Sequence, residues 1–158
     1  MIPEELNKLI GKTGDTAIME VEKGAIKKYA DAIDDDNLLY WDDEYARNSR
    51  YGSIIAPPGF FGWPCFWGEA GPTFSGLLDE VVKAMAKAGF GRVLDGGMEY
   101  EFLIPVRAGD TLAATPRVVN IFERETKGGK MLFSVIETSY LNQNGSLAAR
   151  GRQTIIYR

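Results

Sequence analysis

Residues 111–158, TLAATPRVVNIFERETKGGKMLFSVIETSYLNQNGSLAARGRQTIIYR, decide the fold of this chain. They contain three runs rich in Val, Ile, Thr, Tyr and Phe, the residues that strands favour: Thr111–Glu125, Lys130–Asn142 and Ser146–Arg158. Lys127-Gly128-Gly129 and Asn144-Gly145 separate the runs, and both are good hairpin turns. We therefore expect three antiparallel strands that pair in sequence.

The preceding residues predict two further strands and several helices. Val93–Pro105 has the same strand-favouring composition, and Thr16–Glu22 alternates between apolar and polar residues as a half-buried strand does. Apolar residues recur at helical spacing over Ala25–Ile33 and over Ser75–Ala88. Shorter elements are expected at Glu4–Ile10 (helix), Asp34–Asn37 (turn) and Asp42–Asn48 (helix). This order indicates an α+β fold in which a curved sheet wraps around a helix.

The segment GFFGWPCFWG, residues 59–68, carries five aromatic side chains. Pro58 can be the first residue of a helix that starts near Gly59. A helix that is apolar all round is buried, so we expect Phe61–Trp67 to lie in a buried helix. Cys65 has no histidine to activate it and is expected to be a small buried apolar residue.

Composition limits the classes of function. The chain has 158 residues and a formal net charge of −4, which gives no electrostatic attraction for nucleic acid or an anionic membrane. No run approaches the roughly 18 apolar residues that a membrane span needs. The acidic start MIPEEL lacks the apolar core of a signal peptide, and a single cysteine fits a reducing compartment. We expect a cytoplasmic protein of one domain, residues 1–158, with neither a nucleic-acid nor a membrane partner.

The segment VEKGAIKKYADAIDDDNLLYWDDEY, Val21–Tyr45, resembles the signature of (R)-specific enoyl-CoA hydratases and 3-hydroxyacyl dehydratases, the MaoC-like group of the hot-dog fold. The signature reads Asp, any residue, Asn, Pro, any residue, His. Asp35 and Asn37 stand at its aspartate and asparagine positions, whereas Leu38 replaces the proline and Tyr40 replaces the histidine. The chain contains no histidine at all. The resemblance therefore implies a hydratase-type protein that lacks half of the acid–base pair.

Two further stretches extend the resemblance over most of the chain: YGSIIAPPGF (Tyr51–Phe60) and FLIPVRAGDTL (Phe102–Leu112). The whole is similar to the N-terminal dehydratase-domain type of the family, which is related to the dehydratase domain of type I fatty acid synthase. That type includes the non-catalytic subunits of heterodimeric 3-hydroxyacyl dehydratases. The resemblance implies a hot-dog fold, a curved antiparallel sheet around a central helix, and a dimer whose sheets meet edge to edge.

In active members of the family, Asp and His hold or deprotonate a water that adds to the β-carbon of a 2-enoyl thioester, while backbone N–H groups stabilise the oxyanion. Tyr40, with an ordinary pKa near 10, is a poor base at neutral pH, and Asp35 alone is a weak one. The resemblance thus implies a hydro-lyase subunit, inactive alone, that shapes the acyl groove while a partner hot-dog chain supplies the Asp–His pair. Two alternatives stay open: a homodimeric enoyl-CoA hydratase that uses Asp35, and a non-catalytic acyl-CoA-binding protein.

The candidate catalytic positions are those of the degenerate motif: Asp35, Asn37 and Tyr40. The candidate contacts to an acyl-CoA or acyl-ACP thioester are Pro58, Gly59, Phe60, Phe61 and Trp63. Each set has a simpler interpretation, because acidic runs often end helices in solvent and aromatic side chains often form cores or dimer interfaces. No metal site is expected, since closely spaced carboxylates point in different directions, and the absence of a phosphate-loop motif predicts no nucleotide cofactor.

Overall fold

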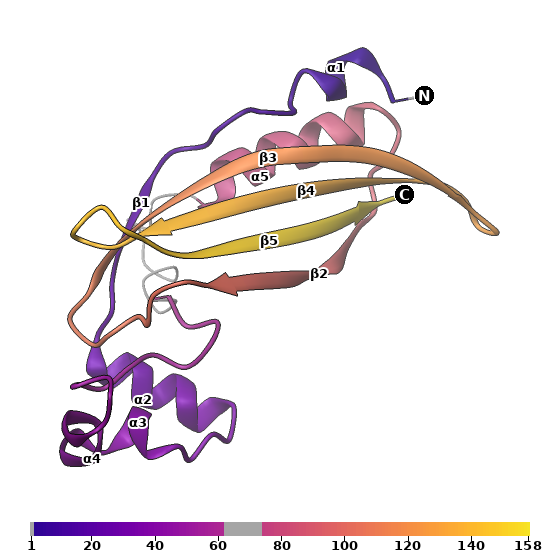
Figure 1. Cartoon of the computed structure of the whole chain (residues 1–158). Coiled ribbons are helices and arrows are strands. Elements are labelled where there is room, and N and C mark those ends of the chain that lie inside the picture. Colours follow the sequence, from indigo (N-terminus) through magenta and orange to yellow (C-terminus); the bar gives the residue numbers. More distant parts are fainter. Residues whose placement is uncertain (1, 62–73) are drawn as a thin grey trace.

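The computed structural model describes residues 2–61 and 74–158. Within them, an antiparallel sheet with the strand order β1-β3-β4-β5-β2 curves around helix α5 (Figure 1). Helices α2, α3 and α4 lie together beyond one end of the sheet. The described elements are α1 (Glu4–Asn7), β1 (Ala17–Glu20), α2 (Lys23–Ala32), α3 (Leu38–Trp41), α4 (Asp43–Asn48), α5 (Phe74–Lys87), β2 (Val93–Phe102), β3 (Thr111–Thr126), β4 (Gly129–Leu141) and β5 (Leu147–Tyr157).

The three C-terminal strands pair in sequence, as their composition predicts. β3 pairs with β4 and β4 pairs with β5, while β1 joins the free side of β3 and β2 joins the free side of β5. Buried and partly exposed residues alternate along β3 and β4, because one face of the sheet covers the core. This is the α+β hot-dog arrangement that the sequence indicates.

The short strand β1 confirms the predicted alternation. Ala17 and Met19 are buried, whereas Ile18 between them is 58% exposed. The expected strand is longer. Val21 N–H still donates to its in-register partner Asp110 O at 2.9 Å, but Val21 O accepts the N–H of Gly109 at 2.8 Å, one residue out of register, so the regular ladder ends at Glu20. The sheet therefore has one short edge, at β1, and one long edge, at β2.

Helix α5 matches the helix predicted over Ser75–Ala88 to within one residue at each end. The buried residues of its described part are four apart: Leu77, Val81 and Met85. Gly89 follows with φ +94°, and its N–H donates to Ala86 O, while Phe90 N–H donates to Met85 O, both at 3.0 Å. These two bonds form a Schellman motif, in which glycine accepts the left-handed conformation that ends the helix.

The helix expected to start near Gly59 does not start there. Gly59 has φ +87°, which a helix excludes, and Phe60 N–H donates to Pro57 O at 3.0 Å to close a turn. Residues 62–68 of that prediction lie outside the described residues. Among the described elements, α5 is the helix that the sheet wraps around, because its apolar face packs on β3, β4 and β5.

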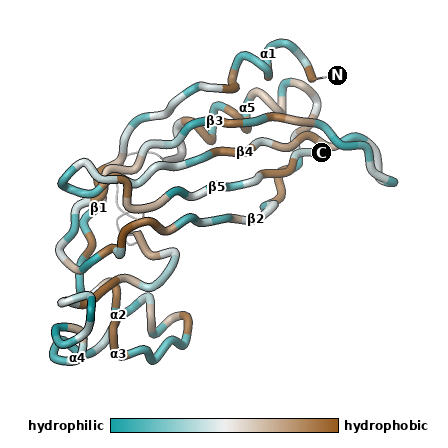
Figure 2. Tube along the Cα trace, viewed as in Figure 1, coloured by the Kyte–Doolittle hydropathy of each residue, from teal (hydrophilic) through white to brown (hydrophobic). Residues whose placement is uncertain are grey.

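Apolar residues form two clusters. One lies between α5 and the sheet and includes Val81 and Leu132. The other lies where α2, the loop 54–61 and the nearby ends of the strands meet, and it includes Ile26, Phe60 and Phe61. Figure 2 shows apolar colouring in that second region and polar colouring at the tip of the β3–β4 hairpin. No helix in the described part of the chain is long and apolar enough to cross a membrane.

Candidate functional site

The motif segment begins where α2 ends. Asp34 turns the chain with φ +57°, a left-handed conformation that Asp adopts more readily than most residues. Asp35 Oδ1 accepts the N–H of Asn37 at 3.1 Å, and Asn37 Oδ1 accepts the N–H of Leu39 at 3.1 Å, which caps α3. Trp41 Nε1 donates to the backbone oxygen of Asp35 at 2.8 Å. Both polar side chains that the motif retains thus hold the backbone of this loop.

Tyr40 lies at the histidine position of the signature. Its side chain is 7% exposed. Burial raises the pKa of Tyr40, the charge of Asp35 and the neighbouring Tyr51 act in the same direction, and a side-chain hydrogen bond with Asn37 opposes them. The Tyr40 hydroxyl is therefore protonated at neutral pH. It can donate a hydrogen bond but cannot take a proton from water.

A cavity of about 450 Å³, here called the motif cavity, brings most of the candidate residues together. Its walls come from residues within 37–40, 51–61 and 102–106, three segments that are distant in sequence. The candidates that line it are Asn37, Tyr40, Pro58, Phe60 and Phe61. Asp35 instead lines a separate hollow of about 230 Å³ beside Trp41. Within the described ranges, no group of three His, Cys, Asp or Glu side chains is placed to hold a metal ion.

Phe60 and Phe61 belong to both the cavity wall and the core. Each is 1% exposed. The Phe60 ring contacts the Tyr29 ring with centroids 5.3 Å apart, and the Phe61 ring stacks on Tyr140 at 4.2 Å. The two interpretations of these aromatic residues, core and cavity wall, therefore apply to the same side chains. Trp63, the fifth predicted contact, lies outside the described residues.

Gly59 is buried but does not line the motif cavity. A Cβ atom there would lie 3.2 Å from Tyr29 Oη, and the positive φ already favours glycine. The turn also engages the Phe60 N–H, which is bonded to Pro57 O and so is not free to stabilise an oxyanion. The Gly59 position therefore shapes the loop behind the cavity wall.

Residues 102–106 form a wall of the motif cavity that the sequence analysis did not assign to the site. Leu103, Ile104 and Pro105 line the motif cavity beyond the end of β2. Two backbone hydrogen bonds bring this segment against residues 54–56: Ala56 N–H to Val106 O at 2.8 Å, and Ala108 N–H to Ile54 O at 3.1 Å. The sequence signal available for this wall was the apolar run FLIPV, which was interpreted as the end of the strand predicted over Val93–Pro105.

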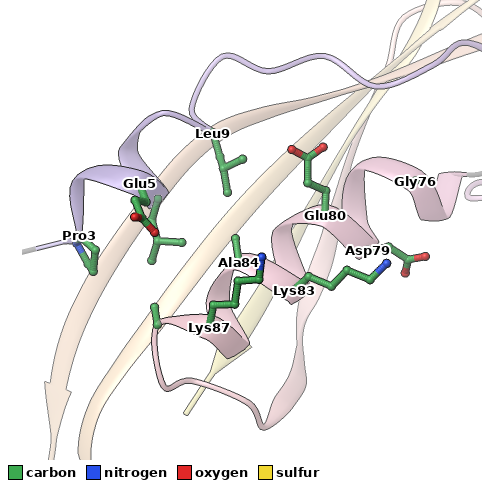
Figure 3. A pocket seen from close by; sticks show the side chains of 11 residues that line it. Pro3, Glu5, Leu9, Gly76, Asp79, Glu80, Lys83, Ala84 and Lys87 are labelled. Atoms are coloured by element: carbon green, nitrogen blue, oxygen red, sulfur yellow. The ribbon is translucent and has the colours of Figure 1, made fainter.

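A groove of about 500 Å³ lies between α1 and α5 and is separate from the motif cavity (Figure 3). Leu9 and Ala84 contribute apolar side chains to its lining, and Glu5, Asp79 and Lys83 contribute charged ones. None of the described candidate residues lines this groove. It is therefore not part of the candidate site.

Comparison with known proteins gives relatives of two kinds. A protein of Streptomyces avermitilis known as UPF0336 is 31% identical over 102 residues, which cover 65% of this chain and 63% of the relative. A probable enoyl-CoA hydratase alpha subunit of Thermomonospora curvata is 25% identical over 136 residues, covering 83% of this chain. This chain spans only 43% of that relative's length.

The solved structures agree on the fold. A chain of the ChsH1–ChsH2 complex from Mycobacterium tuberculosis has a TM-score of 0.83, covers 97% of this chain and 93% of its own length, and is 19% identical. At that identity the likeness shows the fold alone. The resemblance to hot-dog dehydratases of the MaoC-like type is confirmed. A family model described as the FAS1-like dehydratase domain region matches residues 8–150, and the chain therefore belongs to that family.

Proposed function

We propose that this chain is a subunit of a 2-enoyl-thioester hydratase or 3-hydroxyacyl dehydratase, in which it shapes the acyl-binding groove while a partner hot-dog chain supplies the Asp–His pair. One observation carries the proposal. Tyr40, at the histidine position, is buried in the wall of the motif cavity and stays protonated, while Asp35 lines a different hollow. The chain thus has a cavity of the right kind without a base in it.

The chemistry of hydration needs a group that exchanges a proton near neutrality, close to the β-carbon of the thioester. Tyr40 is excluded as that base by the direction of its pKa shift. The Asp35 carboxylate has one oxygen engaged by the Asn37 N–H. The Phe60 N–H is bonded to Pro57 O and so is not free to stabilise an oxyanion. These three positions therefore serve the local structure of this chain rather than a reaction.

The motif cavity suits an acyl chain. Its volume of about 450 Å³ lies within the range of roughly 300–1,000 Å³ that is typical of ligand pockets. Phe60, Phe61, Ile104 and Pro105 give it apolar walls. Asn37 and Tyr40 contribute amide and hydroxyl groups that can orient a thioester. The substrate is therefore taken to be an acyl-CoA or acyl-ACP, with its chain along the apolar wall.

Two comparisons support a role as one of two subunits. The curated relative from Thermomonospora curvata is named as an alpha subunit, and the structural neighbour from Mycobacterium tuberculosis comes from a complex of two different proteins. By analogy, the assembly proposed for this chain is a dimer with a second hot-dog chain that carries an intact Asp–His motif. We also propose that residues 1–158 act as one domain in the cytoplasm, in keeping with the single cysteine.

The test uses the chain purified at native expression level together with whatever hot-dog chain accompanies it. The complex should hydrate crotonyl-CoA, and replacing the partner's motif histidine by alanine should abolish turnover. Asp35→Asn in this chain should leave the complex's turnover within about twofold. Loss of turnover on Asp35→Asn would favour the homodimeric hydratase, whereas tight thioester binding without turnover in any assembly would favour the acyl-CoA-binding protein.

A further inference from the structure

Charged side chains form a row across the outer face of the sheet. The strand registers set Arg117 opposite Glu137, Glu137 opposite Arg152, and Arg152 opposite Glu99. Their signs alternate from β3 to β2. Arg152 Nε donates to Glu137 Oε2 at 2.7 Å, and this contact is the main reason that the pKa of Arg152 is raised. Opposite charges on neighbouring strands stabilise a sheet, so the row has a physical basis.

A second, shorter row, of two charges only, lies one step along the sheet, since Ser139 opposite Arg150 on β4 is uncharged. Arg150 on β5 is opposite Glu101 on β2, and Arg150 Nη1 donates to Glu101 Oε2 at 3.0 Å. Both rows end at β2 with a glutamate. Glu99 and Glu101 share the outer face, because they are two residues apart on one strand. If the alternation of charge continued onto a strand paired with β2, the next residue in each row would be positively charged.

β2 is the open edge at which those rows end. Figure 1 shows it as the outermost strand, and its only neighbour among the described strands is β5. Nine of its ten residues are exposed. Met98 is 43% exposed and Phe102 49%, which leaves apolar area on a long edge strand that lacks proline. Such an edge can pair with another chain unless something prevents it.

We propose that β2 pairs with the edge strand of a different hot-dog chain that carries Lys or Arg opposite Glu99 and Glu101, and that the same two glutamates oppose pairing with a second copy of this chain. The inference rests on the proposed function only in taking the partner to be a hot-dog chain. It adds the chemistry by which the partner is chosen, namely two outward basic side chains spaced two residues apart.

Self-pairing is opposed, in the registers centred at or beside the two glutamates, for a geometric reason. In a two-fold antiparallel pair, the residue at the centre faces its own copy, and residues equally far on either side face each other. A register centred on Tyr100 sets Glu99 opposite the Glu101 of the other copy, twice. Registers centred on Glu99 or Glu101 set one of them opposite itself, and a register centred on Met98 leaves the two copies of Glu99 diagonal. Like charges directly opposite destabilise a strand pair.

The test uses a charge-reversed copy of the chain as a surrogate partner. Wild type, the E99K/E101K variant and their equimolar mixture are compared by sedimentation velocity. The mixture should associate about tenfold or more tighter than either protein alone, because each glutamate then faces a lysine, and the gain should shrink as salt is raised. A mixture that associates no more tightly than wild type alone overturns the proposal.

A neutral variant guards against misfolding of E99K/E101K, in which one introduced lysine would lie beside Arg152 and the other beside Arg150. E99Q/E101Q removes the repulsion and should self-associate about tenfold more tightly than wild type, whereas the control E125Q, on the β3–β4 hairpin, should not. Equal self-association of E99Q/E101Q and wild type contradicts the proposal. These experiments measure association alone. The proposed interface can therefore be wrong while the complex still hydrates its substrate, and the proposed function can be wrong while the interface is right.

Discussion

The ring of Phe61 stacks on the ring of Tyr140, with centroids 4.2 Å apart and planes inclined by 17°. Phe61 lines the motif cavity, and Tyr140 belongs to β4 in the middle of the sheet. The stack therefore fixes the cavity wall to the end of the central strand. Phe102 also contacts Phe61, with ring centroids 6.1 Å apart, but is 49% exposed.

This relationship predicts that Phe61→Ala is costly. Removing a fully buried aromatic side chain should lower the free energy of unfolding by roughly 3–5 kcal/mol, because the lost contacts leave a cavity that cannot fully collapse. Phe102→Ala, the same change in the same cluster at a half-exposed position, should cost clearly less. Urea unfolding of both variants measures the difference, and equal losses would show that the stack does not anchor the wall.

Leu103 offers a test of the acyl-binding wall without a large effect on folding. It lines the motif cavity and is 48% exposed. Leu103→Trp should reduce the affinity for long-chain acyl-CoA by about tenfold, or about 1.4 kcal/mol, with little effect on short chains or on the melting temperature. Leu141→Trp, at a residue that is 38% exposed and does not line the cavity, is the control.

Titration with acyl-CoA esters of increasing chain length, together with a thermal melt of each variant, tests the prediction for Leu103→Trp. If the affinities of the wild type and Leu103→Trp change in parallel across all acyl-chain lengths, the motif cavity is not the acyl site. Trp63 stays a predicted contact, and Trp63→Ala in the same titration tests it. A large melt shift with unchanged chain-length preference would mean that Trp63 only packs in the core.

The raised pKa of Tyr40 predicts a loss of stability at high pH. Burial holds the proton on Tyr40 in the folded chain at pH values where the unfolded chain releases it, with an ordinary pKa of 10.0. The stabilisation is complete below about pH 10 and is lost as pH rises from there toward the folded pKa. Burial raises the pKa of Tyr140 and Tyr157 in the same direction.

Urea unfolding at a series of pH values from about 9 to 11 measures this effect. In Tyr40→Phe the free energy of unfolding should fall less steeply with pH than in the wild type, and at neutral pH loss of the hydroxyl should cost about 1 kcal/mol. Tyr45→Phe, at a residue that is 51% exposed, provides the matched control. Identical slopes for wild type and Tyr40→Phe would show that Tyr40 does not hold its proton through burial.

Much of the fold could be predicted because its signals are local. Strand-favouring composition and, for β1, alternation predicted the strands, and the helical spacing of apolar residues predicted α5. The helix start predicted at Pro58 and Gly59 was wrong: the prolines there resemble a helix start, but Gly59 has a positive φ. The ring contacts of Phe60 and Phe61 with Tyr29 and Tyr140 are made with distant segments. Such contacts leave no trace in the spacing of residues along the chain.

The candidate site was also predicted only in part. The resemblance brought Asn37 and Tyr40 together with Phe60 and Phe61, and the structure sets all four around one cavity. Asp35 was expected beside them, but its side chain is used for a loop hydrogen bond. Such local bonds compete with a catalytic placement, and sequence alone does not decide between them. The wall formed by residues 102–106 depends on backbone bonds to residues 54–56 and was missed for that reason.

The central claim, that this chain shapes a site without supplying its base, is tested most directly by crotonyl-CoA hydration with the isolated chain. Enzymes commonly turn over at about 1–10³ per second, and general acid–base catalysis contributes roughly 10²–10⁴-fold of the rate. We predict turnover below that range by at least about 10²-fold, unchanged by Asp35→Asn. Turnover within the enzyme range that Asp35→Asn abolishes would contradict the claim and make the chain a hydratase in its own right.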